Sequence, residues 1–186
     1  DDDFYWAACE LYATTGDQSY YTDLSGYQNE DADDKAFSIT TNLGGGENNG
    51  SFSSFNWGCT AGLGTLSLYL SDKTSDADRA KVASAITKAA DKYIAKQGEQ
   101  AMGNPYQSAT FTDLVNIGPE PVTGYEWGSN SFVVNNAIVM AYAYDLTDDA
   151  QYMNGVANAM NYLLGCNPLS FSFITGYGTY KEKNPH

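Results

Sequence analysis

One histidine, His186, closes the sequence and directly follows Pro185. A neutral imidazole offers one hydrogen-bond donor and one acceptor, so this side chain could bind polar groups of a ligand. The segment before it contains a helix expected to end at Gly165, a turn marked by Pro168, and a Gly-Tyr-Gly loop at 176–178. Taken alone, a histidine in such a segment is more often an exposed loop residue than a ligand-binding one.

The cysteines and the glycine run do not point to a cofactor. Cys9, Cys59 and Cys166 lack the Cys-x-x-Cys spacing and the histidine neighbours of a zinc site. Cys9 stands in an apolar stretch and is expected to be a small buried residue. The run Gly44–Gly46 lacks the lysine and the helix start of a phosphate-binding loop. The sequence therefore indicates no organic cofactor.

Composition limits the classes of partner. The chain has 186 residues, of which 42% are apolar, enough for one domain with a hydrophobic core. Its net charge of -14 would repel nucleic acids and anionic membrane surfaces. The sequence contains no apolar run of transmembrane length. Its fifteen tyrosines fit either a sugar-binding cleft or a large half-polar surface.

Three stretches share one plan, in which an apolar helix, a short turn and a second helix follow one another. They are Phe4–Leu24, Ala61–Gln97 and Ser131–Gly165. Within the second stretch, Val82 and Ile86 begin an apolar stripe at helical spacing. One helical hairpin cannot bury both of its faces, so the three are predicted to stack.

The ends of these helices carry recognisable signals. Ser75, three residues before Asp78, is predicted to cap one helix, and Asp148 is predicted to cap the helix that starts near 149. Long segments rich in Gly, Asn, Ser and Thr, at 26–56 and 98–127, connect the hairpins. Loops of this length are usually functional, and we expect them to gather on one rim and form a groove.

The sequence resembles family 9 of the glycoside hydrolases, the cellulase family, over nearly its whole length. The histidine signature of that family runs from a small hydroxyl residue through a Gly-x loop to Pro-His-x-Arg. Six residues fall into register: Ser172, Ile174, Thr175, Gly178, Pro185 and His186. Tyr180 stands where a basic or amide residue is usual, and the sequence ends before the arginine. Three further stretches carry the resemblance: DDDFYWAACELYATTGD, NWGCTAGLGTLSLYL and YEWGSNSFVVNNAIVMAYAY.

The resemblance implies an all-α fold, the (α/α)6 barrel of six helical hairpins. Three hairpins make up about half of such a barrel. Residues 1–186 are therefore expected to be part of a single catalytic domain that is incomplete at both ends.

The resemblance also implies an activity. The family hydrolyses β-1,4-glucan with inversion, using one carboxylate to activate water and one carboxylic acid to protonate the leaving oxygen. The regions that supply this aspartate and glutamate lie outside the chain. We therefore expect part of a secreted endo-β-1,4-glucanase, with cellulose or a related β-glucan as substrate and the remaining segments of the domain as partners.

Several site residues follow from the same resemblance. His186 matches a histidine that contacts the sugar near the cleavage point, and Trp127 matches a tryptophan that lines the cleft. Some members bind calcium where Asp2 and Asp3 fall, together with the carbonyl oxygen at the position of Gly58. Each has an alternative: Trp127 as a buried residue at a helix start, and the two aspartates as helix N-terminal charges favoured by the dipole. Trp57, beside Gly58, is expected in the core.

Two other functions remain open at this point. A helical-repeat module without catalysis could bind polysaccharide through Trp127 and the tyrosines. Another toroidal polysaccharide hydrolase or lyase could use carboxylates within the chain, for which Glu126 is the best candidate.

Overall fold

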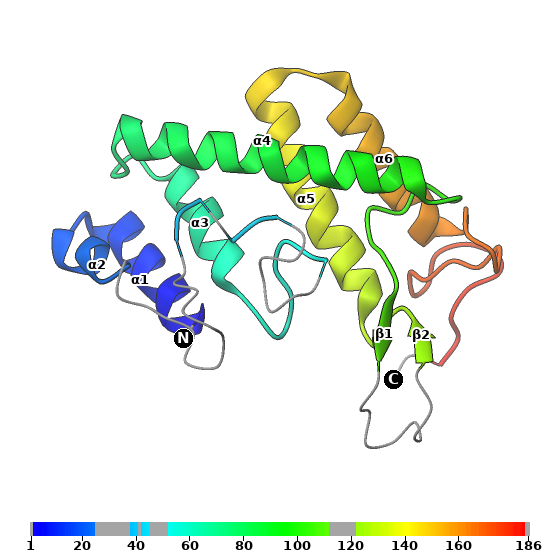
Figure 1. The fold of residues 1–186 in the computed structure, drawn as a ribbon. Coiled ribbons are helices and arrows are strands. Elements are labelled where there is room, and N and C mark those ends of the chain that lie inside the picture. Colours follow the sequence, from blue (N-terminus) through cyan, green and yellow to red (C-terminus); the bar gives the residue numbers. More distant parts are fainter. Residues whose placement is uncertain (1, 25–37, 41, 45–51, 112–121, 185–186) are drawn as a thin grey trace.

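The computed structural model describes residues 2–24, 38–40, 42–44, 52–111 and 122–184. In that part of the chain the regular structure consists of helices and one short antiparallel ribbon (Figure 1). The helices are α1 (Asp2–Thr15), α2 (Gln18–Asp23), α3 (Ala61–Leu70), α4 (Asp76–Glu99), α5 (Ser129–Thr147) and α6 (Ala150–Leu164). The strands are β1 (Ala109–Phe111) and β2 (Val122–Gly124).

The second and third predicted hairpins are confirmed as α3–α4 and α5–α6. The first differs, because α1 ends at Thr15 and is followed by a helix of only six residues, α2. Gly16 adopts a left-handed φ of 72° there, and the Asp17 side chain caps α2 by accepting from the Ser19 amide at 2.9 Å. The main packing partner of α1 is α3, the next long helix.

Two of the three predicted helix ends are confirmed and one is shifted. Ser75 caps α4 by accepting from the Asp78 amide at 3.2 Å, and Gly165 ends α6 with a φ of 123°. The expectation that Asp148 caps α6 is wrong by one residue. The connection is so short that Asp148, at φ 54°, ends α5, while Asp149 caps α6.

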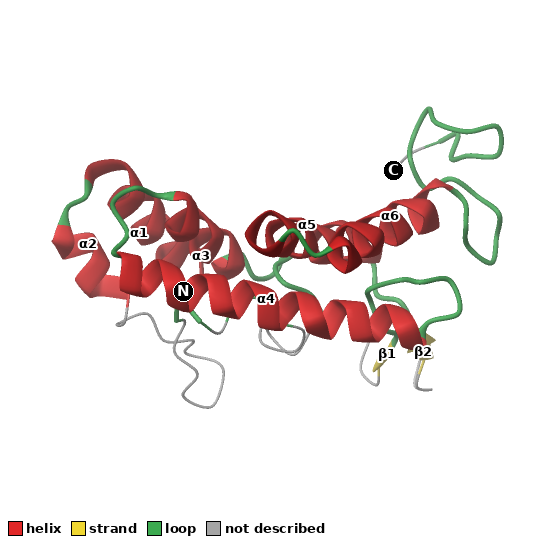
Figure 2. Cartoon of the chain, turned by 90° about the horizontal axis from the view of Figure 1, so that it is seen from above, coloured by secondary structure: helices red, strands yellow, loops and turns green. Residues whose placement is uncertain are grey.

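The hydrophobic core has two parts. The larger lies where α4 crosses α5 and α6, and it contains the predicted stripe of α4 from Val82 and Ile86 to Tyr93 (Figure 1). The smaller lies between α1 and α3 and contains Cys9, which is fully buried as expected. Seen from above, α4 runs along both groups of helices (Figure 2). This helix therefore joins the two parts of the fold.

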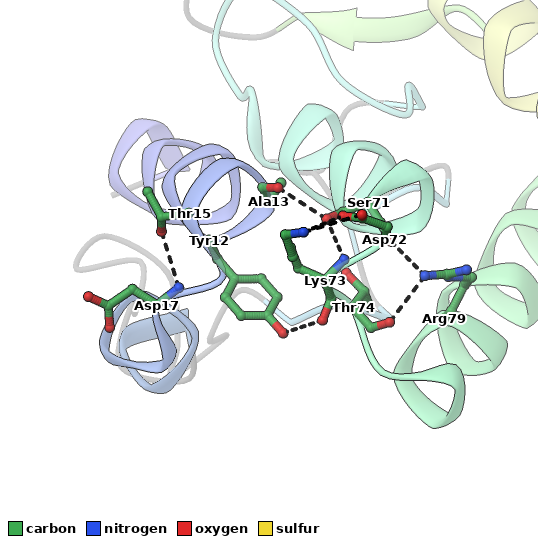
Figure 3. Close-up of polar contacts among 9 residues, drawn as sticks. All are labelled: Tyr12, Ala13, Thr15, Asp17, Ser71, Asp72, Lys73, Thr74 and Arg79. Carbon is green, nitrogen blue, oxygen red and sulfur yellow. Dashed lines mark hydrogen bonds and ion pairs between the residues drawn. The ribbon is translucent and has the colours of Figure 1, made fainter.

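Polar contacts fix the turn between α3 and α4 against α1 (Figure 3). The buried Tyr12 of α1 donates its hydroxyl hydrogen to the Lys73 carbonyl oxygen at 2.7 Å. Arg79 donates from Nη2 to the carbonyl oxygens of Ser71, at 2.6 Å, and Thr74, at 3.1 Å. These bonds give hydrogen-bond partners to carbonyl groups of the turn at 71–74, which lies between α3 and α4.

Much of the expected groove-forming segments, at 25–37, 41, 45–51 and 112–121, lies outside the described residues. The part at 52–60 and the β1–β2 ribbon lie below α4 in Figure 1. The ribbon pairs Thr110 with Thr123, whose hydroxyls are 2.8 Å apart. None of the helices in the described ranges has the length and apolar character needed to cross a bilayer.

Candidate functional site

Two tryptophans, Trp57 and Trp127, form an exposed pair, called the tryptophan pair below. Their ring centroids lie 6.3 Å apart and their planes cross at 79°, so the rings meet edge to face. Trp57 is 71% exposed and Trp127 is 79% exposed. The expectation that Trp57 belongs to the core is therefore wrong, and so is the alternative of a buried Trp127. Both indoles are accessible to a flat ligand surface.

Trp57 is exposed because it stands at the tip of a tight turn, 56–59. The backbones of Asn56 and Cys59 exchange two hydrogen bonds, of 2.9 and 3.1 Å. The Asn56 side chain closes the turn by accepting from the Gly58 amide at 2.7 Å. Cys59 is 1% exposed, so the turn is anchored in the core while the indole stays outside.

A buried amide side chain, Asn136 of α5, holds the segment before this turn. Its Oδ1 accepts from the Ser54 amide at 2.8 Å, and its Nδ2 donates to the carbonyl oxygens of Phe52, at 3.1 Å, and Pro105, at 3.0 Å. Asn136 has no exposed surface, so these partners replace the water that its amide would otherwise bind. The neighbouring Asn135 donates to the Phe55 carbonyl oxygen at 2.9 Å.

Trp127 is carried by the turn that starts α5. Gly128 has a left-handed φ of 78°, which favours glycine, and a Cβ there would lie 3.8 Å from Trp57 Nε1. The Gly128 carbonyl oxygen accepts from both the amide, at 2.9 Å, and the hydroxyl, at 2.7 Å, of Ser131. The backbone of this turn therefore passes beside the Trp57 ring.

Glu126, the residue before Trp127, accepts a hydrogen bond on Oε1 from the hydroxyl of Tyr106. The Tyr106 ring packs against Tyr125 and Phe132 at centroid distances of 5.6 and 5.4 Å. This carboxylate was the strongest catalytic candidate for a different toroidal enzyme, and the structure gives it a partner in the core.

The predicted calcium ligands Asp2 and Asp3 lie in the first turn of α1, where the helix dipole favours negative charge. Asp2 Oδ2 accepts from the Thr60 amide at 2.6 Å and from the Thr60 hydroxyl at 3.0 Å, and Asp3 Oδ1 accepts from the same hydroxyl at 3.0 Å. Both carboxylates therefore meet the segment that contains Gly58, two residues before Thr60.

This donor set agrees with calcium in its chemistry. Two carboxylates and a backbone carbonyl oxygen are the hard ligands that Ca²⁺ prefers. Burial raises the pKa of the neighbouring Cys59 thiol to about 11. In the described ranges, no group of three or more His, Cys, Asp or Glu side chains could hold a metal ion. Further oxygen ligands would have to be backbone carbonyls or water.

His186 lies outside the described residues. The loop that leads toward it is held to the end of α6, because the Phe173 amide donates to the Leu163 carbonyl oxygen at 2.8 Å. Tyr180 packs edge-on against Phe171, with centroids 5.0 Å apart, and is 63% exposed. Tyr180 is the residue that stands where the family signature usually has a basic or amide residue.

Sequence reasoning missed Trp57 and Asn136 as site residues. The signal for Asn136 was a polar residue in the apolar run of Ser131–Tyr144, where only a hydrogen-bonded amide is tolerated. The signal for Trp57 was the neighbouring Asn-x-Gly pattern at 56–58, which favours a turn.

Solved structures of glycoside hydrolases match this arrangement of helices. A metagenome-derived family 9 endoglucanase superposes with a TM-score of 0.69 over 99% of the chain and 28% of the solved chain, at 22% identity. A family 9 protein of Bacteroides ovatus gives a TM-score of 0.67 over 99% of the chain and 29% of its own, at 25% identity. The described helices thus form part of an (α/α)6 barrel.

Sequence comparisons give the same result. A cellulose 1,4-beta-cellobiosidase of Acetivibrio thermocellus is 40% identical over the whole chain, and endoglucanase C of Cellulomonas fimi is 33% identical over the whole chain. The chain spans only 20% and 14% of the lengths of these two relatives. The family model described as glycosyl hydrolase family 9 matches residues 1–186. The chain therefore belongs to glycosyl hydrolase family 9.

Proposed function

We propose that the chain is part of the catalytic domain of a secreted endo-β-1,4-glucanase and forms one side of its glucan-binding cleft. The exposed tryptophan pair is the observation that carries this proposal, because neighbouring indoles open to solvent offer flat apolar faces on which sugar rings can stack. Family membership supports a glycoside hydrolase, and the names of the relatives support a β-1,4-glucan as substrate.

The chemistry of an inverting hydrolase needs two carboxyl groups about 6.5–9.5 Å apart, one as general base for water and one as general acid for the leaving oxygen. We assign these two groups to segments outside this chain. The contribution of this chain is binding: Trp57 and Trp127 stack on sugar rings and exclude water from them. His186 exchanges hydrogen bonds with sugar hydroxyls near the cleavage point.

We also propose that Asp2, Asp3 and the Gly58 carbonyl oxygen hold a calcium ion. The convergence of both carboxylates on Thr60 supports this assignment. An ion there would join the start of α1 to the turn that carries Trp57, so its role would be to stabilise the cleft wall.

Binding of cellohexaose, measured by titration calorimetry, tests the proposal. We expect Trp57→Ala and Trp127→Ala each to weaken binding about tenfold or more, the loss of one aromatic stacking contact. Trp6→Ala is the matched control, because Trp6 lies on α1 and bonds to Glu10 at 2.9 Å, apart from the pair. Equal losses in all three variants would show that the pair has no special role.

Hydrolysis of carboxymethylcellulose separates the proposed enzyme from a module that only binds. The chain should release no reducing ends alone and should do so when the remaining segments of the domain are supplied. Binding without hydrolysis in both cases would favour the polysaccharide-binding module, and full activity of the chain alone would contradict our placement of the catalytic carboxylates.

A further inference from the structure

Trp127, which is exposed, directly follows Glu126, whose side chain accepts a hydrogen bond from the buried Tyr106. We propose that Tyr106 is a positioning residue: its hydroxyl, bonded to Glu126, fixes the turn that carries Trp127 and so the geometry of the tryptophan pair. The consequence for sugar binding rests on the proposed function, whereas the consequence for the geometry does not.

Tyr106 is itself firmly placed. It is 1% exposed, and its ring packs against Phe132 of α5 and against Tyr125. Its amide donates to the Asn104 side chain at 3.1 Å, and Asn104 in turn donates to the Tyr125 hydroxyl at 3.2 Å. Its burial and its packing against Phe132 of α5 therefore restrict where the Tyr106 hydroxyl lies.

The hydrogen bond from Tyr106 also restricts Glu126, the residue directly before Trp127. A hydroxyl bonded to a carboxylate is among the stronger hydrogen bonds in proteins, so the Glu126 side chain is held in one orientation. The Glu126 carbonyl oxygen accepts from the Ser129 amide at 3.2 Å, which closes the turn on the far side of Trp127. Trp127 is thus fastened on one side by Glu126 and on the other by Gly128, whose carbonyl oxygen binds Ser131.

Trp127 depends on this anchoring more than a buried residue would. At 79% exposure its ring has few packing contacts of its own, so the backbone turn must restrict it. Trp57 is held separately, by the Asn56–Cys59 turn and by the bonds of Asn136. Loss of the Tyr106 hydroxyl should therefore shift Trp127 relative to Trp57. A pre-arranged pair loses less conformational entropy when it binds a ligand.

The test uses the chain labelled with 5-fluorotryptophan. Its three tryptophans give three fluorine resonances, which the single Trp→Phe variants assign. Tyr106→Phe removes only the hydroxyl and keeps the ring that packs in the core. Tyr12→Phe is the matched control, because it removes a buried hydroxyl bonded to the Lys73 carbonyl oxygen, on the α1 side of the fold (Figure 3).

We expect Tyr106→Phe to shift the resonances of Trp127 and Trp57, leave that of Trp6 unchanged, and weaken cellohexaose binding about two- to tenfold, the cost of ordering one side chain that is no longer pre-arranged. Tyr12→Phe should leave the pair resonances and the affinity unchanged. Glu126→Gln keeps an oxygen acceptor, so its resonance shifts and its loss of affinity should lie between those of Tyr106→Phe and the unmodified chain. It replaces Tyr106→Phe in the test if that variant fails to fold.

Unchanged Trp127 resonances in both Tyr106→Phe and Glu126→Gln, or equal shifts in Tyr12→Phe, would overturn the proposal. The two hypotheses fail in different ways. If the resonances shift but the unmodified chain binds no cellohexaose, the positioning role stands and the glucan-binding function is lost. If cellohexaose binds normally and neither the resonances nor the affinity respond to Tyr106→Phe, the positioning role is lost and the function stands.

Discussion

At the scale of single residues, Asn136 shows how a buried polar side chain organises a surface site. Its amide makes three hydrogen bonds to backbone groups of two distant segments, and none of its surface is exposed to water. Removal of the amide would leave these backbone groups buried and unpaired, each at about 1–3 kcal/mol. The tryptophan turn at 56–59 directly follows one of the segments it holds.

We predict that Asn136→Ala lowers the free energy of unfolding by about 3 kcal/mol or more. Asn135→Ala, which removes a single bond to Phe55 from a half-buried side chain, should lower it by about 1 kcal/mol. Urea denaturation followed by circular dichroism measures both. Equal losses in the two variants would contradict the distinction drawn between these neighbouring amides.

At the scale of elements, α4 and α6 approach closely at Gly155. A Cβ on Gly155 would lie 2.5 Å from Ile94 Cδ1 of α4 and 2.8 Å from Met140 Sδ of α5, so an alanine there would require the ends of these two side chains to shift. Gln97 of α4 donates to the Gly155 carbonyl oxygen at 2.8 Å, which adds a polar contact at the same crossing.

We predict that Gly155→Ala destabilises the chain by about 1 kcal/mol, because the strain of moving Ile94 and Met140, about 1–3 kcal/mol, outweighs the helix-propensity gain of about 0.5–1 kcal/mol. Gly98 of α4 is the matched control, since a Cβ there meets nothing within 4 Å. Gly98→Ala should stabilise the chain by about 0.5–1 kcal/mol through helix propensity. Thermal unfolding distinguishes the two, and a neutral Gly155→Ala would show that the crossing can relax.

The predictable part of the fold follows directly from local chemistry. The spacing of Val82 and Ile86 predicted the buried face of α4, and Ser75 and Gly165 predicted helix ends, because caps and stripes depend on neighbouring residues only. The shift of the α6 cap from Asp148 to Asp149 shows the limit, since two adjacent aspartates offer the same cap and the length of the turn decides between them.

The candidate site was less predictable. The family resemblance indicated Trp127, whereas Trp57 was expected in the core, although the Asn-x-Gly pattern at 56–58 favours a turn. The exposure of Trp57 depends on the Asn56–Cys59 backbone pairing and on Asn136, whose hydrogen bonds to the preceding segment span 82 and 84 residues of sequence. Long-range contacts of this kind leave almost no trace in a single sequence.

At the scale of the whole molecule, a hydrogen bond between α2 and α4 links the α1–α3 side of the fold to the long helix α4. Tyr21 of α2 donates to Asp78 Oδ2 of α4 at 2.5 Å, and Lys81 lies 2.6 Å from Asp78 Oδ1. The hydrogen bonds from Lys81 and Tyr21 lower the pKa of Asp78 to about 2. Because these bonds favour the charged carboxylate only in the folded chain, they link stability to pH.

The direction in which stability changes with pH follows from the lowered pKa of Asp78. The contribution of Asp78 should be complete above about pH 4, the ordinary pKa of an aspartate, and should disappear as the pH falls through about 2. We predict that Asp78→Asn is less stable than the unmodified chain at pH 5–7 and equal to it near about pH 2. Asp72→Asn replaces a carboxylate that is 82% exposed, so it should change the stability of the chain little at either pH. Urea midpoints across this range measure the difference, and a constant gap down to about pH 2 would contradict the assignment.

The bonds of Asn136 also set an order of folding. They close loops of 82 and 84 residues back to 52–54 and one of 31 residues to Pro105, and contacts across such separations form late because the loops must first be closed. We therefore expect the segment before the tryptophan turn to become ordered only after α5 is in place. A nascent or partly unfolded chain would consequently lack the assembled tryptophan pair.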